Sequence, residues 1–179
     1  MENDGIYDFI VTGAGSAGCA VASRLSEGPY SVLLLEAGPP DRSPWIHAPA
    51  GMAHLFDDAK HNWRFQSEPV PGLNNRVLYQ PRGKVLGGTS SINGTVYMRG
   101  TAGDYDEWRQ RGCEGWDWDS VLPMFKRAED QARGADDFHA IGGPLRVSDL
   151  PNASGLPRAM VDAAIQAGVP PNADFNGAT

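Results

Sequence analysis

A short glycine-rich segment near the N-terminus constrains the fold more than any other feature of the chain. The segment 13–18 has glycine at its first, third and sixth positions, directly after the apolar run 7–12 and before a helix-like stretch, 16–27. A strand that turns through such a segment into a helix is typical of a dinucleotide-binding βαβ unit. Glycine permits the tight turn, lets the backbone approach a pyrophosphate, and allows the helix to pack closely on the strand. The sequence therefore predicts an α/β fold of the Rossmann type.

The next apolar run supports this interpretation and narrows the choice of cofactor. Residues 31–35 predict a second strand, which ends in Glu36, 18 residues beyond Gly18. A carboxylate at this place can accept hydrogen bonds from both ribose hydroxyls of a dinucleotide, but it would repel a 2′-phosphate. FAD or NAD therefore fits, and NADP fits poorly. The alternative is a packed βαβ unit without a ligand, in which Glu36 only ends its strand.

Composition argues against several classes of protein. The chain has 179 residues, enough for one domain or slightly more, and its formal net charge of −7 disfavours a nucleic acid partner. It has no apolar run of about twenty residues that would span a membrane. The polar and acidic residues 1–5 leave no room for a secretory signal, so we expect a cytoplasmic protein. Two cysteines, Cys19 and Cys113, make neither a disulfide framework nor a metal site.

Three histidines recur at intervals of seven residues, at His47, His54 and His61. On a helix, this spacing would place the three histidines on one face, where they could share a metal ion. A proline and a glycine interrupt any such helix, and no carboxylate pattern accompanies the histidines, so we expect no metal site. The surrounding stretch, 38–82, is too rich in proline for long helices and too aromatic for a disordered linker. It predicts an ordered excursion over a cofactor or substrate. Trp63 either offers a flat face or an indole N–H near an adenine, or anchors this loop to the core.

A second segment of small residues lies about seventy residues beyond the first. It reads GKVLGGTSSINGTVYMRG over residues 83–100, with Arg82 before it and Asp106 after it. Its N–H groups and hydroxyls suit close approach to a diphosphate or a flavin edge. This segment closely resembles the signature of the glucose-methanol-choline (GMC) oxidoreductase family. Essentially the whole chain fits that resemblance, which extends through the segments 104–108, 115–118, 121–129 and 142–147.

The resemblance implies a division of the chain into two parts. The first, 1–140, would be the N-terminal part of a Rossmann-like FAD-binding domain of the GMC type, with a flavin-covering excursion at 38–103. The second, 141–179, would be the start of an α+β substrate domain. Family members are longer, so the resemblance also implies a remaining C-terminal part, in a second chain or a continuation, that holds the catalytic histidine. His139 lies in what we interpret as a surface loop, and we expect no catalytic residue within this chain.

For the complete enzyme, the resemblance implies oxidation of a small-molecule alcohol to a carbonyl by hydride transfer to flavin N5. Carried over onto the matching positions of this sequence, it also implies a set of contacts with FAD. These residues are Gly13, Gly15, Ser16, Ala17, Gly18, Glu36, Ala37, Trp63, Val85, Gly88, Asn93, Gly94, Thr95 and Val96.

Two positions indicate which branch of the family the chain resembles. Some members tether the flavin through a histidine directly before the conserved asparagine, and here Ile92 stands before Asn93, so we expect non-covalent FAD. Fatty-acid photodecarboxylases, which resemble this family, carry a cysteine where Ser91 stands, so that branch is disfavoured. The sequence is also compatible with a non-catalytic flavin-binding fragment and with an NAD-dependent dehydrogenase.

Local signals predict two helices in the second half of the chain. The first is expected over 104–111, with Asp104 as its cap and Gly112 as its stop. The second is expected over 156–167, where apolar residues recur at helical spacing before Gly168.

Overall fold

The computed structural model describes residues 5–150 and 155–178. These residues form two compact units, one up to Val96 and one from Tyr97. The domain limit expected after residue 140 stays a prediction. Residues 1–4 lie outside the described part, so the cytoplasmic location expected from the first residues stays a prediction as well.

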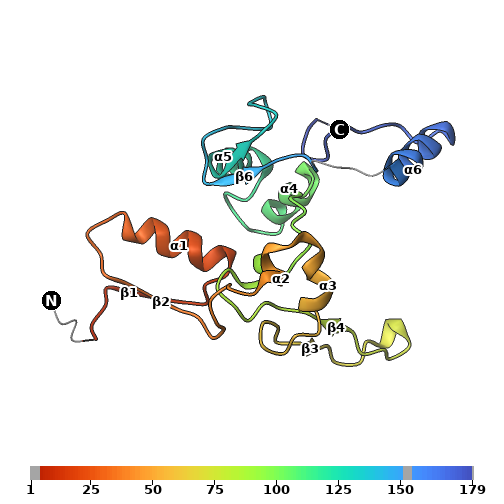
Figure 1. The fold of residues 1–179 in the computed structure, drawn as a ribbon. Helices are drawn as coiled ribbons and strands as arrows, with labels where there is room; N and C mark the ends of the chain where they lie inside the picture. The colour runs from red at the N-terminus through yellow and green to blue at the C-terminus, as the bar shows by residue number, and fades with distance from the viewer. Residues whose placement is uncertain (1–4, 151–154, 179) are drawn as a thin grey trace. The chain divides into compact units, whose positions relative to one another are not determined.

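The first unit opens with a βαβ arrangement (Figure 1). Strands β1 (Phe9–Thr12) and β2 (Val32–Leu35) pair in parallel, with Phe9 opposite Val32. Helix α1 (Ser16–Ser26) connects the two strands and packs against both of them. Parallel neighbours need such a crossover connection, and a helix is the usual one. The predicted α/β fold is therefore confirmed, and the helix ends within one residue of its expected limit.

A polar contact fixes the start of both strands. Asp8 Oδ2 accepts hydrogen bonds from the backbone N–H of Ser31 at 2.7 Å and from its hydroxyl at 2.8 Å. These bonds favour the ionised carboxylate and hold the pKa of Asp8 below its ordinary value. The parallel register therefore begins at a defined pair of residues, at the end of the strands opposite the glycine-rich turn.

The proline-rich excursion of the first unit folds into short elements around a small core. Leu55, Val85 and Ile92 are buried together, and Ile46 packs against them. Strands β3 and β4 form an antiparallel hairpin, with Phe65 opposite Gln80. The elements in order are α2 (Pro44–His47), η1 (Pro49–Gly51), α3 (Met52–Leu55), β3 (Phe65–Gln66), η2 (Pro71–Leu73), β4 (Tyr79–Gln80) and η3 (Gly88–Ser91).

The three regularly spaced histidines have separate partners in this unit. His47 Nε2 lies 2.6 Å from the carbonyl of Asp41, and His61 Nδ1 lies 2.6 Å from Asp58 Oδ2. The His54 ring lies against Trp45, with 4.0 Å between the centroids. Within residues 5–150 and 155–178, no three metal-ligating side chains gather in one place.

The second unit contains α4 (Ala102–Gln110), α5 (Trp118–Ala128), β5 (Glu129–Gln131), β6 (Leu145–Val147) and α6 (Gly155–Gln166). Strands β5 and β6 are parallel, and α4 packs against α5. The expected cap of α4 is wrong, because Thr101 precedes the helix and Asp104 occupies its third position. The Asp104 carboxylate instead accepts a hydrogen bond from the Thr101 backbone N–H at 2.7 Å, as in a capping box.

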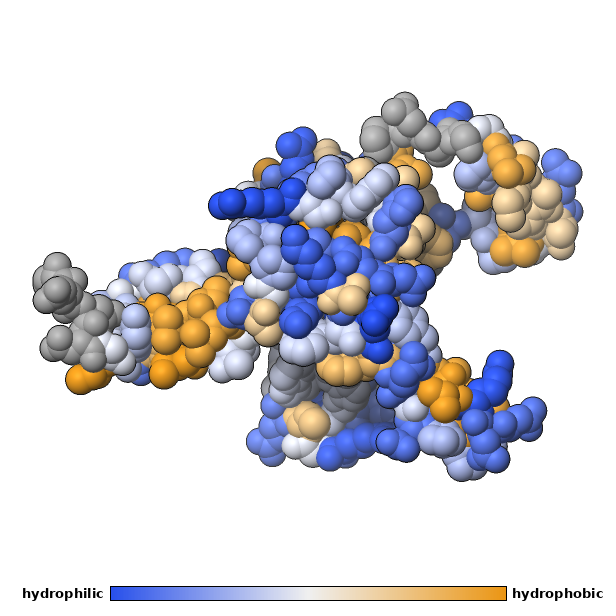
Figure 2. All heavy atoms as spheres, turned by 60° about the horizontal axis from the view of Figure 1, so that its bottom comes forward, coloured by the Kyte–Doolittle hydropathy of each residue, from blue (hydrophilic) through white to orange (hydrophobic). Residues whose placement is uncertain are grey.

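Apolar side chains are exposed on both units (Figure 2). In the first unit they gather over β1 and β2, where Ile10 is 61% exposed. In the second unit they lie along α6, where Leu156 is 71% exposed. Among the helices of the described residues, none has both the length and the apolar character to cross a bilayer.

Candidate cofactor site

The turn between β1 and α1 depends on glycine in two different ways. Gly13 has a φ of +89°, in the left-handed region that favours glycine, and its N–H donates to the carbonyl of Leu35 at 2.7 Å. A Cβ on Gly18 would lie 1.9 Å from the Gly13 carbonyl oxygen. Helix α1 can therefore pack this closely on the turn only because residue 18 has no side chain.

Gly15 occupies a more open place in the same turn. A Cβ built on it would meet only the Gly88 Cα, at 3.9 Å. The first intrahelical hydrogen bond runs from the Cys19 N–H to the Gly15 carbonyl at 2.9 Å. The preceding helical N–H groups, of Ser16, Ala17 and Gly18, are left to meet an acceptor beyond the helix end. With no acidic residue in the first turn, this N-terminus suits an anionic group such as a pyrophosphate.

Glu36 follows β2 and turns its carboxylate back toward the glycine-rich turn. Its Oε2 accepts from the backbone N–H of Ala14 at 2.8 Å, and its Oε1 accepts from that of Gly38 at 2.9 Å. Glu36 therefore fixes the turn, a role that the sequence pattern did not predict. Each carboxylate oxygen has more than one acceptor site, so both remain able to accept from ribose hydroxyls. Ala37 lies between the two bonded residues, Glu36 and Gly38.

The two glycine-rich segments meet in space. The Gly87 N–H donates to the Ala14 carbonyl at 2.7 Å, which places the second segment directly on the first turn. A Cβ on Gly88 would lie 2.8 Å from the Gly15 Cα, a distance that real Cβ atoms do not tolerate. Val85, just before these glycines, is fully buried in the core of the unit. The first turn and the second segment therefore form one region, which contains Gly15, Gly88 and Val85.

The segment around Trp63 is held by a buried asparagine. Asn62 Oδ1 accepts from the backbone N–H groups of Arg64 at 2.9 Å and Arg82 at 3.0 Å. Trp63 itself is 45% exposed, and Lys84 Nζ lies 4.7 Å from the centre of its ring. The indole also stacks on the Phe65 ring, with 5.8 Å between the centroids, so it is partly covered by neighbours on its own loop and partly exposed.

The segment Asn93–Val96 carries an unusual backbone conformation. Thr95 has a φ of +54°, which is rare for a β-branched residue. The Thr95 N–H donates to Asn93 Oδ1 at 2.9 Å, a hydrogen bond that stabilises this conformation. The Thr95 N–H is therefore already bonded within the chain. Gly94 and Val96 flank Thr95, and both are exposed.

His139 does not lie in a surface loop, contrary to the expectation from its polar neighbours. Only 2% of it is exposed, and both of its ring nitrogens face carboxylates. Its partners come from segments distant in the sequence, so no local pattern would have indicated its burial.

Comparison with known proteins decides the family. A family model described as GMC oxidoreductase matches residues 7–179. The chain belongs to the GMC oxidoreductase family. The resemblance found in the sequence is thereby confirmed over nearly the whole chain.

Among curated GMC relatives, a mitochondrial choline dehydrogenase of Mus musculus is 49% identical, over 96% of this chain and 30% of the relative. An alcohol dehydrogenase (acceptor) of Pseudomonas putida is 48% identical, over 97% of this chain and 32% of the relative. Among solved structures, pyridoxine 4-oxidase from Mesorbium loti has a TM-score of 0.82 at 38% identity, and the match covers 91% of this chain and 32% of the oxidase chain. The chain spans about a third of the length of these relatives.

Proposed function

We propose that this chain is the FAD-binding portion of an enzyme that oxidises an alcohol to a carbonyl compound. The observation that carries this proposal is the contact between the two glycine-rich segments, at Gly15 and Gly88. It supports a cradle in which the backbone of both segments approaches one extended ligand. The names of the relatives, choline dehydrogenase and alcohol dehydrogenase (acceptor), support an alcohol as substrate class.

The geometry of the cradle fits the parts of FAD. The N–H groups at the start of α1 suit the diphosphate, and the Glu36 carboxylate suits the ribose of the adenosine half. Trp63, Val85 and the segment 93–96 are proposed to contact the remaining parts of the cofactor. Within 93–96, the Gly94 and Val96 N–H groups are the candidates to stabilise negative charge on the ring, since the Thr95 N–H is bonded to Asn93.

The bound flavin would supply the hydride acceptor, through its N5 atom. The residues of this chain would hold and orient it, and would exclude a 2′-phosphorylated dinucleotide through Glu36. We propose that the catalytic base and most of the substrate domain belong to a further C-terminal part. The length of the relatives, about three times that of the matched region, supports this.

Anaerobic mixing tests the proposed reaction. Flavin-loaded holoenzyme should lose its yellow colour when mixed with one of three alcohols, choline, a simple primary alcohol or pyridoxine. Colour that persists with every alcohol would favour a non-catalytic flavin-binding role. Colourless protein that reduces NAD would favour the NAD-dependent dehydrogenase.

Glu36→Ala is expected to weaken cofactor retention by about 1.5–3 kcal/mol, the range for hydrogen bonds to a charged group. The substitution removes the ribose acceptor and also frees the N–H groups of Ala14 and Gly38. The dissociation constant of FAD, measured by flavin fluorescence on the holoenzyme, reports the change. Glu114→Ala, at an exposed position, is the matched control and should leave retention unchanged. Equal retention in both variants would mean that Glu36 serves only the turn.

Acid precipitation is expected to release the flavin into the supernatant. Ile92 has no nucleophile, and its side chain is buried against Leu55 and Val85. The measurement is flavin absorbance in the supernatant and in the washed pellet, with a covalently flavinylated protein treated in parallel. Yellow colour that stays in the pellet would show a covalent link through another residue.

A further inference from the structure

The second unit has a hollow that is lined by α4, α5 and the turn between them. Its volume is about 410 Å³, and small-molecule pockets generally measure about 300–1,000 Å³. Three aromatic rings, two aliphatic side chains and one serine supply most of the lining, and none of these residues belongs to the proposed cofactor cradle. The lining side chains of this aromatic hollow are Tyr105, Trp116, Ser120, Val121, Met124 and Phe125.

The rings of the aromatic hollow belong to a larger aromatic cluster. Tyr105 is only 9% exposed, and its hydroxyl oxygen accepts from the Gly100 N–H at 3.2 Å, which fixes the ring. The Phe125 ring meets it edge-on, with 5.8 Å between the centroids. Trp116 is 52% exposed and is supported from behind by Trp108, at 5.7 Å between the centroids. Aromatic faces carry a negative quadrupole charge, so a wall of this kind attracts a cation.

A second hollow, of about 400 Å³, adjoins the first and is acidic. The two meet at Asp117, whose Oδ1 accepts from the Ser120 hydroxyl at 2.9 Å and from its N–H at 3.0 Å. These hydrogen bonds hold the pKa of Asp117 below its ordinary value, so the carboxylate is ionised at neutral pH. Three carboxylates and one guanidinium make the lining net negative. Its residues are Asp106, Arg109, Gln110, Asp117 and Asp119.

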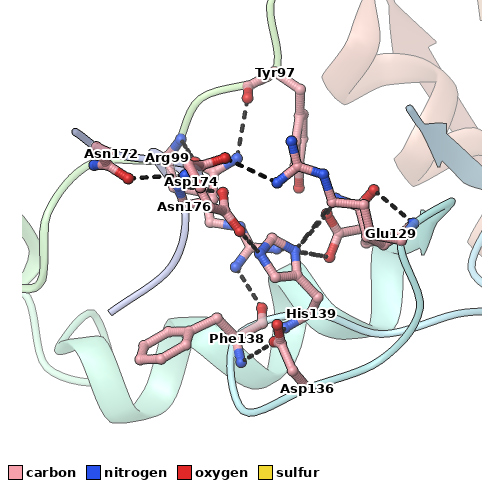
Figure 3. A network of polar contacts seen from close by, with 12 residues as sticks. Tyr97, Arg99, Glu129, Asp136, Phe138, His139, Asn172, Asp174 and Asn176 are labelled. Carbon is pink, nitrogen blue, oxygen red and sulfur yellow. Dashed lines mark hydrogen bonds and ion pairs between the residues drawn. The ribbon is translucent and has the colours of Figure 1, made fainter. Parts of the chain in front are cut away.

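One guanidinium already lies against the wall of the aromatic hollow. The guanidinium carbon of Arg99 is 5.3 Å from the Phe125 ring centroid. Its charge is offset within a buried network, where Arg99 Nη2 lies 2.9 Å from Glu129 Oε2 (Figure 3). In the same network His139 lies between Glu129 and Asp174, at 3.1 Å and 2.8 Å. Arg99 therefore leaves the negative charge of the acidic hollow uncompensated, and it shows that one ring of the wall already contacts a cation.

The lining favours a cation whose charge is covered by alkyl groups. Val121 has no hydrogen-bond acceptor, Met124 has only a weak one, and the Ser120 hydroxyl hydrogen is directed to Asp117. A primary ammonium has three N–H donors that these walls would leave without partners, which is costly. A quaternary ammonium has none, and aromatic faces bind such cations well. We propose that the aromatic hollow binds a small quaternary ammonium cation, with its charge beside Asp117.

Fluorine NMR of the flavin-loaded holoenzyme tests the proposal, with 5-fluorotryptophan in place of tryptophan. The probe is tetramethylammonium chloride, and Trp116→Leu identifies the Trp116 signal by its loss. This signal should shift and reach saturation. tert-Butanol supplies methyl groups without a charge and has no carbinol hydrogen to transfer, and sodium chloride at equal ionic strength supplies charge without methyl groups. Tetramethylammonium should bind about twofold to thirtyfold more tightly than tert-butanol, the range for cation–π contacts.

Two variants with matched controls locate the bound cation. Met124→Lys places an ammonium group in the aromatic hollow and should abolish the saturable shift, and Met124 is 60% exposed, so the fold should tolerate the change. Met160→Lys adds the same charge on α6, at a position 65% exposed, and should leave binding unchanged. Asp119→Asn should weaken binding by about twofold to fivefold, the range for exposed ion pairs. Asp57→Asn, exposed in the first unit, is its control and should have no effect.

The outcomes that would overturn the proposal are distinct. Equal shifts with tetramethylammonium and tert-butanol would indicate a docking surface for an apolar side chain instead. The absence of a saturable shift, or a shift that Met124→Lys leaves unchanged, would exclude cation binding in this hollow. Each result is read from the Trp116 signal, so it does not depend on whether an alcohol reduces the flavin.

Discussion

Gly15→Val is expected to abolish flavin binding while the chain still folds. A Cβ on Gly15 meets only the Gly88 Cα, at 3.9 Å, so the cofactor-free turn has room for the start of a side chain. The two methyl groups of valine would then occupy the space in which the backbone approaches the pyrophosphate. The ratio of flavin to protein absorbance in the purified holoenzyme measures the loss, and circular dichroism checks the fold.

Two further glycine variants separate binding from folding. Gly15→Ala adds only the Cβ, so it should retain more flavin than the valine variant. Gly18→Ala should destabilise the fold itself, because its Cβ would lie 1.9 Å from the Gly13 carbonyl oxygen. Yellow, stoichiometrically loaded Gly15→Val protein would contradict the proposed site.

The βαβ unit could be predicted from the sequence because its signals are local. A strand, a turn with glycine at fixed spacing and a helix follow one another within 7–27, and the structure has them in that order. The role of Glu36 could be predicted only in part. Its distance from Gly18 along the chain indicates a ribose ligand, but nothing in that spacing indicates hydrogen bonds to Ala14 and Gly38. These contacts depend on the path of the chain after β2, which turns the Glu36 carboxylate back toward the glycine-rich turn.

The cap of α4 differs from the prediction although a local signal is present. Thr101 and Asp104 stand three residues apart at the start of a helix with aromatic residues, which is close to the capping-box pattern. Asp104 alone resembles a cap because aspartate is common at that position. The threonine before it has the extended backbone of a cap residue, so it takes the position and the carboxylate accepts from its N–H.

The charged network around His139 has no comparable signal. Its polar neighbours in the sequence are typical of an exposed loop, and a single histidine among aspartates forms no periodic pattern that would indicate a buried side chain. Its burial depends on Arg99, Glu129 and Asp174, which are separated from it by 40, 10 and 35 residues. A network assembled from four separate segments can be recognised only when the fold has brought them together.

Residues 1–179, expressed alone, are expected to self-associate. Parallel sheets are normally covered on both faces, but Ile10 on β1 is 61% exposed, and Leu35 on β2 is exposed as well. A sheet of two strands also has two open edges that can pair with other chains. Size-exclusion chromatography with light scattering should therefore show large species, and added alcohol should not reduce any flavin that is bound. Co-expression with a C-terminal part taken from a GMC relative should restore a defined size and alcohol-dependent flavin reduction.

A pair of lysine variants shows whether the exposed sheet is the cause of self-association. Ile10→Lys places a charge on the exposed face and should shift the isolated chain toward smaller species. Val85→Lys places the same charge in the buried core and should increase self-association, because it disrupts the packing with Leu55 and Ile92. A parent chain that instead purifies as a monomeric, cooperatively melting, FAD-loaded domain would contradict the expected dependence on a C-terminal part. A non-catalytic flavin-binding role would then replace the proposed function, because a unit that covers its own apolar surface and retains FAD is complete without a substrate domain.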